Sequence, residues 1–513
     1  MNKYIKSIFF VALLGLVSCS DDFLTNYPTA SQETGGAATE GAILANLTSC
    51  YQILLFDSYA NNNYNSIVLM SDLRSDDIYK GGGDAGDQGQ LYRLSQLDAT
   101  ANELPEGLWT IYFTGLNRSN NALLACENAI GVDDVALNQY KAEAHFLRAY
   151  FVHWLWKFWG NIPYFEEELE APYMAPQYTA DQIYAEIMED LDWALDGDKL
   201  PMDVTAENAG RITKAAAMLL RARVVMYQND MGRFGEVLAD MNEIYEKGSY
   251  ALVDYASIWT REGEYCDESI FEINHLPGEF GGKTWADGWA GFGTNLPAFI
   301  SPNGLTGHDL LSETGDEKSV YKGGWGFGPV RPEFVALFEK DDARLSASVN
   351  QFAAGDYTPR FQDTGYFMAK YAARVEYNEP PGDVDLNYEN NLRVFRYAEV
   401  LLNAAELMVV HGVAPVGSLT AQDALDKIRD RADLDPVSAT AENIKLERRR
   451  EFMGEGMRFW DLVRWGEAAV LTESIPEYSS ERTWEDYKKY LPIPQSEIDR
   501  TEGEFKLQQN TGY

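Results

Sequence analysis

The chain has 513 residues, of which 45% are apolar and 13% aromatic, enough to bury a large core and to form more than one lobe. It carries 80 acidic side chains against 42 basic ones, a formal net charge of −38. This sign argues against nucleic acid as a partner and against a basic patch for anionic lipid, because the chain would repel both polyanions. An uncharged ligand is compatible with the charge.

Residues 1–18 predict a lipoprotein signal peptide rather than part of the fold. Two lysines precede an apolar run that is too short to span a bilayer, and Leu-Val-Ser then leads directly to Cys19. This is the arrangement of a bacterial lipoprotein cleavage site, so we expect Cys19 to become the acylated N-terminus. A polar tether is expected over residues 19–36. No later segment approaches 18 uninterrupted apolar residues, so lipid is the expected attachment to the membrane.

Residues 37–260 are dominated by apolar residues at helical spacing. The pattern predicts a helix over 38–56, and the acidic, glycine-rich stretch 71–90 predicts a surface loop. Further helices are expected at roughly 106–130, 137–159, 180–196, 212–229 and 233–247. The second of these carries a stripe of aromatic side chains, which indicates core far more often than a ligand platform. The last two form a pair close to the ~34-residue period of a tetratricopeptide-like unit.

Between residues 261 and 392 the helical pattern mostly disappears, and Gly, Pro, Asn and Asp become dense. A structureless loop of this length is uncommon within a compact domain. The region therefore predicts a second, irregular subdomain with short strands and a helix near 332–338, laid on the helical scaffold.

Residues 393–513 return to the helical pattern and predict a second helix pair at 395–411 and 420–432. The stretch 447–466, ERRREFMGEGMRFWDLVRWG, then alternates charged and aromatic side chains. Glu447–Arg450, Glu455–Arg458, Arg458–Asp461 and Asp461–Arg464 stand three apart, which allows pairing on a helix surface. Two glycines in its middle predict close packing or a kink between two helical pieces. We interpret the stretch as a half-buried structural ion network rather than a catalytic cluster.

The same stretch resembles the C-terminal signature of the SusD/RagB family, the surface lipoproteins of Bacteroidetes nutrient-uptake systems. Further similarity lies in Trp-Gly-Asn-Ile-Pro at 159–163, in Gly-Arg-Ile-Thr-Lys at 210–214 and in the ending 491–499, so it spans almost the whole chain. The resemblance implies a mostly α fold, with a tetratricopeptide-like helical scaffold and a loop-rich, ligand-binding subdomain. It also implies a non-enzymatic role: capture of an oligosaccharide at the outside of the outer membrane and delivery to a SusC-like TonB-dependent transporter.

A sugar-binding surface needs flat apolar faces flanked by polar groups, and aromatic side chains on glycine-bordered loops supply them. The best candidates lie in the loop-rich subdomain and comprise Trp285, Trp289, Phe292, Trp325 and Phe327. A second set lies in or beside the earlier loop and comprises Asp76, Tyr79 and Tyr92. For any single one of these aromatics, local packing is the simplest explanation. The set as a whole is therefore a better indicator of a binding surface than any one member.

Other functions remain as alternatives. Some relatives take peptides, and 80 carboxylates leave a lipid-anchored glycoside hydrolase open, although nothing singles out an acid–base pair. No cofactor or metal is expected: zinc spacings are absent, and the calcium-like start at Asp383 places a tyrosine where the turn glycine belongs. A Cys50–Cys126 disulfide is possible in an exported protein but is not predicted.

Overall fold

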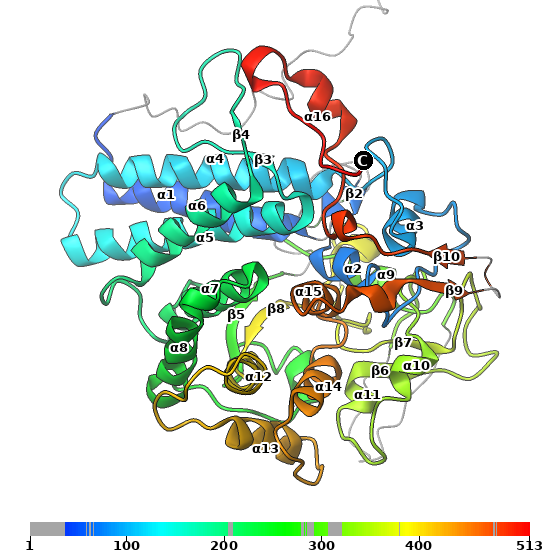
Figure 1. Ribbon diagram of the computed structural model, residues 1–513. Helices are drawn as coiled ribbons and strands as arrows, with labels where there is room; N and C mark the ends of the chain where they lie inside the picture. Colours follow the sequence, from blue (N-terminus) through cyan, green and yellow to red (C-terminus); the bar gives the residue numbers. More distant parts are fainter. Residues whose placement is uncertain are drawn as a thin grey trace, which may run out of the picture.

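The computed structural model describes residues 36–513 except 58, 61–62, 65, 204–208, 277, 279–281, 283, 285–291, 306–320, 379, 476–477 and 479. Cys19, Trp285 and Trp289 therefore lie outside the described residues. The fold is mostly α, as expected, with short two-stranded sheets (Figure 1).

The N-terminal half is helical. Its helices are α1 (Glu40–Leu54), α2 (Ile67–Asp72), α3 (Gly89–Gln96), α4 (Gly107–Glu127), α5 (Asp134–Trp159), α6 (Ala180–Leu195), α7 (Lys214–Gln228) and α8 (Phe234–Lys247). Two small hairpins accompany them, β1 (Tyr59–Ala60) with β2 (Asn63–Tyr64) and β3 (Ile162–Pro163) with β4 (Gln177–Tyr178). The five predicted helices from 106 to 247 are confirmed, with ends that differ from the expectation by a few residues.

Threonine side chains fix several helix starts. Thr179, Thr213, Thr420 and Thr440 each accept a hydrogen bond from a backbone N–H in the first turn of the following helix. Such caps stabilise a helix by roughly 1 kcal/mol, because they satisfy a donor that has no partner within the helix. The starts of these helices are thus determined by nearby residues in the sequence.

The helices pack in a chain of neighbours that bends into an arc around the loop-rich part (Figure 1). The order is α1, α4, α5, α6, α7 and α8, after which α8 packs against α12 (Tyr397–Val409), and α12 against α13 (Ala421–Arg431) and α14 (Ala441–Glu451). The aromatic stripe of α5 is core, since Phe151, Trp154 and Phe158 are all at most 3% exposed. The scaffold thus buries its aromatic stripe against neighbouring helices, as expected.

The loop-rich part enters and leaves the scaffold through one antiparallel strand pair, β5 (Ser269–Ile273) with β8 (Leu392–Arg396). Between these strands lie α9 (Leu296–Ile300), α10 (Pro332–Val335), α11 (Leu345–Ser348) and the hairpin β6 (Val349–Gln351) with β7 (Tyr366–Met368). The helix expected near 332–338 is α10, which is shorter than expected. The C-terminal part ends with α15 (Arg458–Arg464), the hairpin β9 (Glu473–Ile475) with β10 (Ser480–Arg482), and α16 (Gln495–Arg500).

The stretch 447–466 is a helix end, a turn and a second helix. Gly454 and Gly456 have φ values of 74° and 72°, so the chain breaks there between α14 and α15, as the two glycines predict. Of the four predicted pairs, Glu447–Arg450 and Asp461–Arg464 form, at 3.7 and 2.9 Å. The break explains why Glu455 turns away from Arg458 and instead pairs with Arg396 at 2.7 Å.

The centre of this ion network is Glu451, which is fully buried. Its carboxylate pairs with Arg344, Arg396 and Arg431 at 3.2, 3.1 and 2.6 Å. These arginines come from the loop-rich part, from β8 and from α13, so the network joins the inserted region to the scaffold. Its members are inaccessible to a ligand, which supports the structural interpretation.

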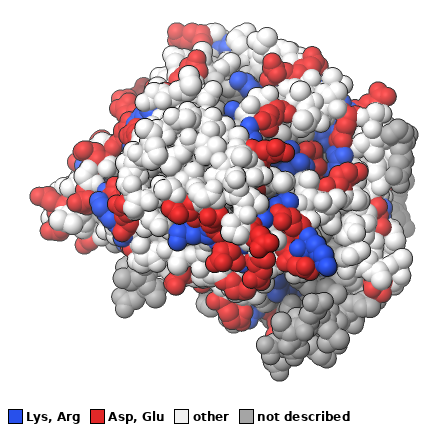
Figure 2. Space-filling model, turned by 60° about the horizontal axis from the view of Figure 1, so that its bottom comes forward, with Lys and Arg blue, Asp and Glu red and all other residues white. Residues whose placement is uncertain are grey.

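Several arginines lie in the interior, and the largest fully buried side chains include Arg74, Arg344, Arg396, Arg429 and Arg448. Acidic groups therefore dominate the accessible charge. Figure 2 shows the face seen when the bottom of Figure 1 is turned forward, with acidic side chains gathered in its lower part and fewer basic ones among them.

Candidate functional site

The site is built on residues 73–92, whose start is fixed to the C-terminal helices. Asp76 accepts a hydrogen bond from Arg458 Nε at 2.8 Å and pairs with Arg449 at 3.0 Å. Burial alone would raise the pKa of Asp76, but the hydrogen bond from Arg458 and the charge of Arg449 outweigh it and lower the pKa to about 2. Asp76 was expected to face a ligand. Its carboxylate is instead an ionised anchor that holds the loop to the scaffold.

Two segments about 250 positions apart in the sequence meet beyond this anchor. Backbone bridges join Ile78 to Val330 and Gly81 to Phe327. The N–H of Tyr79 donates to the carbonyl of Pro329, and that of Gly82 to the carbonyl of Gly326, both at 2.8 Å. The structure thus brings together the two regions that sequence reasoning selected separately, 71–92 and 323–327.

Glycine makes this approach possible. Gly81 has a φ of 71°, and a Cβ built on it would lie 2.3 Å from the carbonyl oxygen of Gly326. Gly82 has a φ of 73°, and its Cβ would lie 2.7 Å from the Phe327 ring. A larger residue at either position would force the two segments apart, so Gly81 and Gly82 are a packing requirement of the site.

Four partly exposed rings form what we name the loop aromatic cluster: Tyr79, Tyr92, Phe361 and Tyr478. Ring centroids lie 5.4 Å apart for Tyr79 and Tyr478, 6.2 Å for Phe361 and Tyr478, and 6.1 Å for Tyr92 and Phe361. Each pair meets edge to face, a favourable arrangement of aromatic quadrupoles. The cluster presents several ring surfaces at one place on the molecule.

Sequence reasoning selected Tyr79 and Tyr92 but missed Phe361 and Tyr478. The N–H of Phe361 donates to the carbonyl of Gly82 at 3.0 Å, which carries residues 360–361 to the glycine-rich loop. Phe361 lies in the aromatic-rich stretch 352–371, which the sequence analysis did not select, whereas no local signal marks Tyr478. Tertiary contacts bring both residues to the site.

Trp325 lies on the same pair of segments and is partly exposed. Its ring packs edge to face on Phe299, with centroids 4.7 Å apart. Its carbonyl accepts a hydrogen bond from Arg360 Nη1 at 2.8 Å, while the Arg360 guanidinium lies 3.7 Å from the Asp87 carboxylate. The indole is thus partly exposed and packed against Phe299, while Arg360 holds the backbone of Trp325 in place.

The remaining candidates differ. Phe327 is 2% exposed, and Lys80 Nζ lies 5.0 Å from its ring centre, so this ring packs under the loop and is no platform for a ligand. This corrects the expectation that it is presented. Phe292 is 37% exposed, and among the described residues no ring contact joins it to the loop aromatic cluster.

The structure also bears on the metal site, the disulfide and the membrane span that the sequence analysis considered. Within the described residues, no three His, Cys, Asp or Glu side chains are grouped so that they could hold a metal ion. Asn387, near the calcium-like start, donates its side-chain amide to the carbonyl of Asp383 at 2.7 Å and closes a turn. Cys50 and Cys126 are both buried and unbridged, and burial raises the pKa of Cys50 to about 12. None of the helices in the described ranges is both long enough and apolar enough to cross a membrane.

Comparison with known proteins identifies the family. The family model described as "SusD family" matches residues 342–513, and the one described as "Starch-binding associating with outer membrane" matches residues 22–226. A SusD-like protein of Formosa agariphila is 26% identical over 74% of this chain and 74% of its own.

Solved structures extend the similarity. "Surface glycan-binding protein A" from Bacteroides fluxus is 57% identical over 93% of this chain and 100% of its own, with a TM-score of 0.87. Its namesake from Bacteroides thetaiotaomicron, solved in complex with laminarihexaose, is 35% identical over 92% of this chain and 100% of its own, with a TM-score of 0.84. The chain therefore belongs to the SusD/RagB family and has the SusD-like fold.

Proposed function

We propose that this protein binds a neutral, laminarin-type oligosaccharide at the loop aromatic cluster and Trp325, without chemical conversion. The observation that carries the proposal is the edge-to-face contact of four partly exposed rings, those of Tyr79, Tyr478, Phe361 and Tyr92, beside the place where residues 78–82 meet 326–330. Apolar ring faces suit the C–H side of a sugar. The similar structures support the ligand class, since one of them holds laminarihexaose.

The charge of the chain favours a neutral ligand over an acidic glycan. The formal net charge of −38 would repel a polyanion at long range, whereas an uncharged glucan experiences no such barrier. A receptor that must release its cargo is expected to bind with a dissociation constant in the micromolar to millimolar range, about −8 to −4 kcal/mol.

Titration calorimetry with laminarihexaose tests the proposal, with maltohexaose as a glucan of different linkage. Tyr79→Ala, Tyr478→Ala and Trp325→Ala should each weaken binding by roughly 2- to 10-fold, because an aromatic contact is worth ~0.5–1.5 kcal/mol beyond area burial. Tyr265→Ala removes a partly exposed ring outside the cluster and is the matched control. EDTA should change nothing, and no sugar shorter than the hexasaccharide should appear.

If all three variants fold and bind like the wild type, the site lies elsewhere. Release of shorter sugars would contradict the receptor function and support the glycoside hydrolase alternative.

We further propose that Cys19 carries the lipid anchor, so that the protein faces outward from the outer membrane and passes its ligand to a SusC-like TonB-dependent transporter. Support comes from the Leu-Val-Ser-Cys sequence and from the family. Each buried methylene contributes ~0.8 kcal/mol, so several acyl chains give stable attachment. Cys19→Ala should abolish lipid labelling and leave the protein in the soluble fraction after a carbonate wash. Retention of the variant in the membrane would contradict the anchor.

A further inference from the structure

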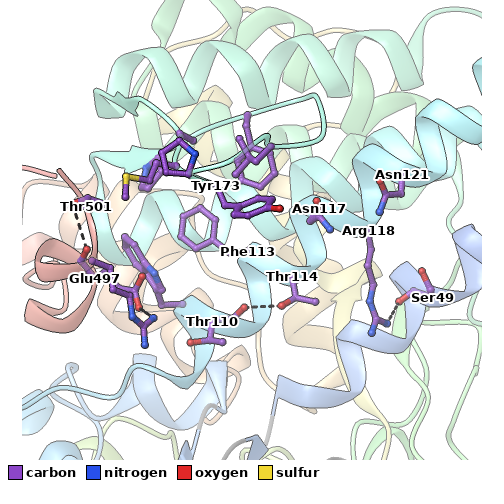
Figure 3. Close-up of a pocket in the computed structure, with 18 of the residues that line it drawn as sticks. Ser49, Thr110, Phe113, Thr114, Asn117, Arg118, Asn121, Tyr173, Glu497 and Thr501 are labelled. Carbon is purple, nitrogen blue, oxygen red and sulfur yellow. Dashed lines mark hydrogen bonds and ion pairs between the residues drawn. The ribbon is translucent and has the colours of Figure 1, made fainter. Parts of the chain in front are cut away.

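A hollow of the molecule lies on α1, α4, the segment 163–175 and α16, and it shares no residue with the loop aromatic cluster (Figure 3). Its volume of about 910 Å³ lies within the range of small-ligand clefts, ~300–1,000 Å³. In Figure 1 these elements occupy the top of the molecule, whereas β6, β7 and α10 lie at the lower right. We call this hollow the α4 groove.

Aromatic side chains line one side of the α4 groove. Trp109 and Phe113 lie one helical turn apart on α4 with ring centroids 4.8 Å apart, and Phe113 is partly exposed. Figure 3 shows the Tyr173 ring beside that of Phe113, with its hydroxyl end toward Asn117. The rings thus offer apolar faces inside the hollow.

Tyr173 is the most exposed of these rings and sits on a strained backbone. Tyr173 is 73% exposed, so its apolar ring gains little stabilisation from burial at this position. Its φ is 61°, a conformation that bulky residues rarely adopt, and its N–H donates to the carbonyl of Glu170 at 2.7 Å. Strain of order 1 kcal/mol at an exposed aromatic is typical of ligand clamps.

The rest of the groove supplies neutral hydrogen-bonding groups. The side-chain amides of Asn117 and Asn121 make no hydrogen bond to any described residue and therefore offer both donors and acceptors. The charged groups are already engaged: Arg118 donates to the carbonyl of Ser49 at 2.7 Å, and Arg500 pairs with Glu497 at 2.5 Å. The groove thus combines ring faces with uncommitted amides and little free charge.

We propose that the α4 groove is a second binding site for a neutral oligosaccharide, with Tyr173 and Phe113 against the sugar faces and Asn117 and Asn121 on the hydroxyls. A purely apolar groove would suit a protein helix, whereas open amides beside rings suit a ligand rich in hydroxyls. The proposal rests on the proposed function for the ligand class only. It assigns that ligand to a site built from different elements.

Two sites on one chain have a consequence for long polysaccharides. Once the loop aromatic cluster holds one stretch of a glycan, the α4 groove meets another stretch at high effective concentration, provided the glycan can span the distance. A polymer should therefore be retained more strongly than a hexasaccharide, and loss of the groove should weaken polymer retention more than hexasaccharide affinity.

The test uses the full mature chain in native gels containing laminarin and in titrations with laminarihexaose. A loop variant, Tyr79→Ala/Tyr478→Ala, removes the first site and should still be retarded by laminarin. Adding Tyr173→Ala/Asn121→Ala should abolish the residual retardation, while adding Tyr173→Phe, which keeps the ring, should preserve it. In the wild-type background, Tyr173→Ala should weaken laminarin retention by roughly 2- to 10-fold.

The outcomes separate the two proposals. Absence of glycan binding by the wild type would contradict both proposals. If the loop variant shows no residual retardation, the second site is overturned and the first proposal is unaffected. The same conclusion follows if the residual retardation persists after the Tyr173 and Asn121 changes. Wild-type glycan retention by Tyr173→Ala, together with loss of a co-purifying membrane protein, would make the groove a protein interface and would also overturn the proposal.

Discussion

Lys80 holds the glycine-rich loop in shape from inside. Its side chain is fully buried, and its Nζ donates to the backbone carbonyls of Asp84, at 2.7 Å, and Asp87. Burial lowers the pKa of Lys80 to about 8, although the carboxylates of Asp87 and Asp84 oppose the shift.

Lys80→Met should loosen the loop, because it keeps the apolar stem and leaves the carbonyls without their donor. Because these carbonyls are only partly buried, the loss of their donor should cost at most ~1–3 kcal/mol of unfolding free energy. Amide hydrogen exchange of residues 80–92 should accelerate and laminarihexaose affinity should fall. Lys199→Met is the control, since Lys199 Nζ also donates to a backbone carbonyl, that of Trp193 at 2.6 Å, away from the site. Equal loss of affinity in both variants would contradict a role specific to the loop.

Arg396 is the residue on which the buried ion network depends most. It pairs with Glu268 at 2.5 Å, with Glu455 at 2.7 Å and with Glu451 at 3.1 Å, and it is 1% exposed. Arg396→Ala should cost about 3–5 kcal/mol in urea denaturation, because it leaves buried carboxylates without compensation. Arg93→Ala, at a surface pair, should cost under ~1 kcal/mol. Near wild-type stability of Arg396→Ala would show that the network is energetically neutral.

At the scale of elements, the contact between 78–82 and 326–330 holds the part of the loop that carries Tyr79. Gly81→Ala combines a positive φ with a clash against Gly326, whereas Gly131→Ala has a similar φ of 67° and open space around its Cβ. Both should lose about 1–2 kcal/mol from the left-handed backbone. Only Gly81→Ala should also weaken laminarihexaose binding, as measured by calorimetry. Equal binding in the two variants would show that the site does not depend on this contact.

Much of the helical scaffold could be predicted from the sequence, because its information is local. The expected helix 106–130 is α4, Gly107–Glu127, and the glycines at 454 and 456 mark the break before α15. The site could be predicted only in part. Trp325 and Phe327 share one glycine-rich stretch, yet Trp325 is partly exposed and Phe327 is buried. Which ring faces solvent depends on Lys80 and Phe299, whose contacts no local pattern reveals.

At the scale of the whole molecule, four buried carboxyl groups form two pairs with opposite responses to pH. Burial alone would raise the pKa of Glu451 and of Glu406, but the charges of Arg431 and Arg464 respectively, with those of neighbouring groups, hold both well below the usual range. At Asp240 and Glu264, burial prevails over the arginines and raises the pKa to about 6 and about 7 respectively.

These shifts predict a stability maximum at mildly acidic pH. Carboxyls with a lowered folded pKa stabilise the protein above their unfolded pKa of ~4.3, and this contribution is lost as the pH falls further. Carboxyls with a raised folded pKa contribute below ~4.3, and that contribution is lost as the pH rises through their folded values. The melting temperature should therefore rise from about pH 8 to about pH 5 and fall steeply below about pH 4.

Glu264→Gln isolates one part of this profile. Its amide oxygen can still accept the hydrogen bond from the N–H of Asn391, which the carboxylate accepts at 3.0 Å, but it cannot titrate. The variant should flatten the profile between about pH 5 and about pH 8 and leave the acid limb unchanged, because the acid limb depends on Glu451, Glu406 and their arginines. Scanning calorimetry across this range measures both limbs. A wild-type melting temperature that falls steadily from pH 8 to pH 5 would contradict the raised pKa of Glu264 and of Asp240.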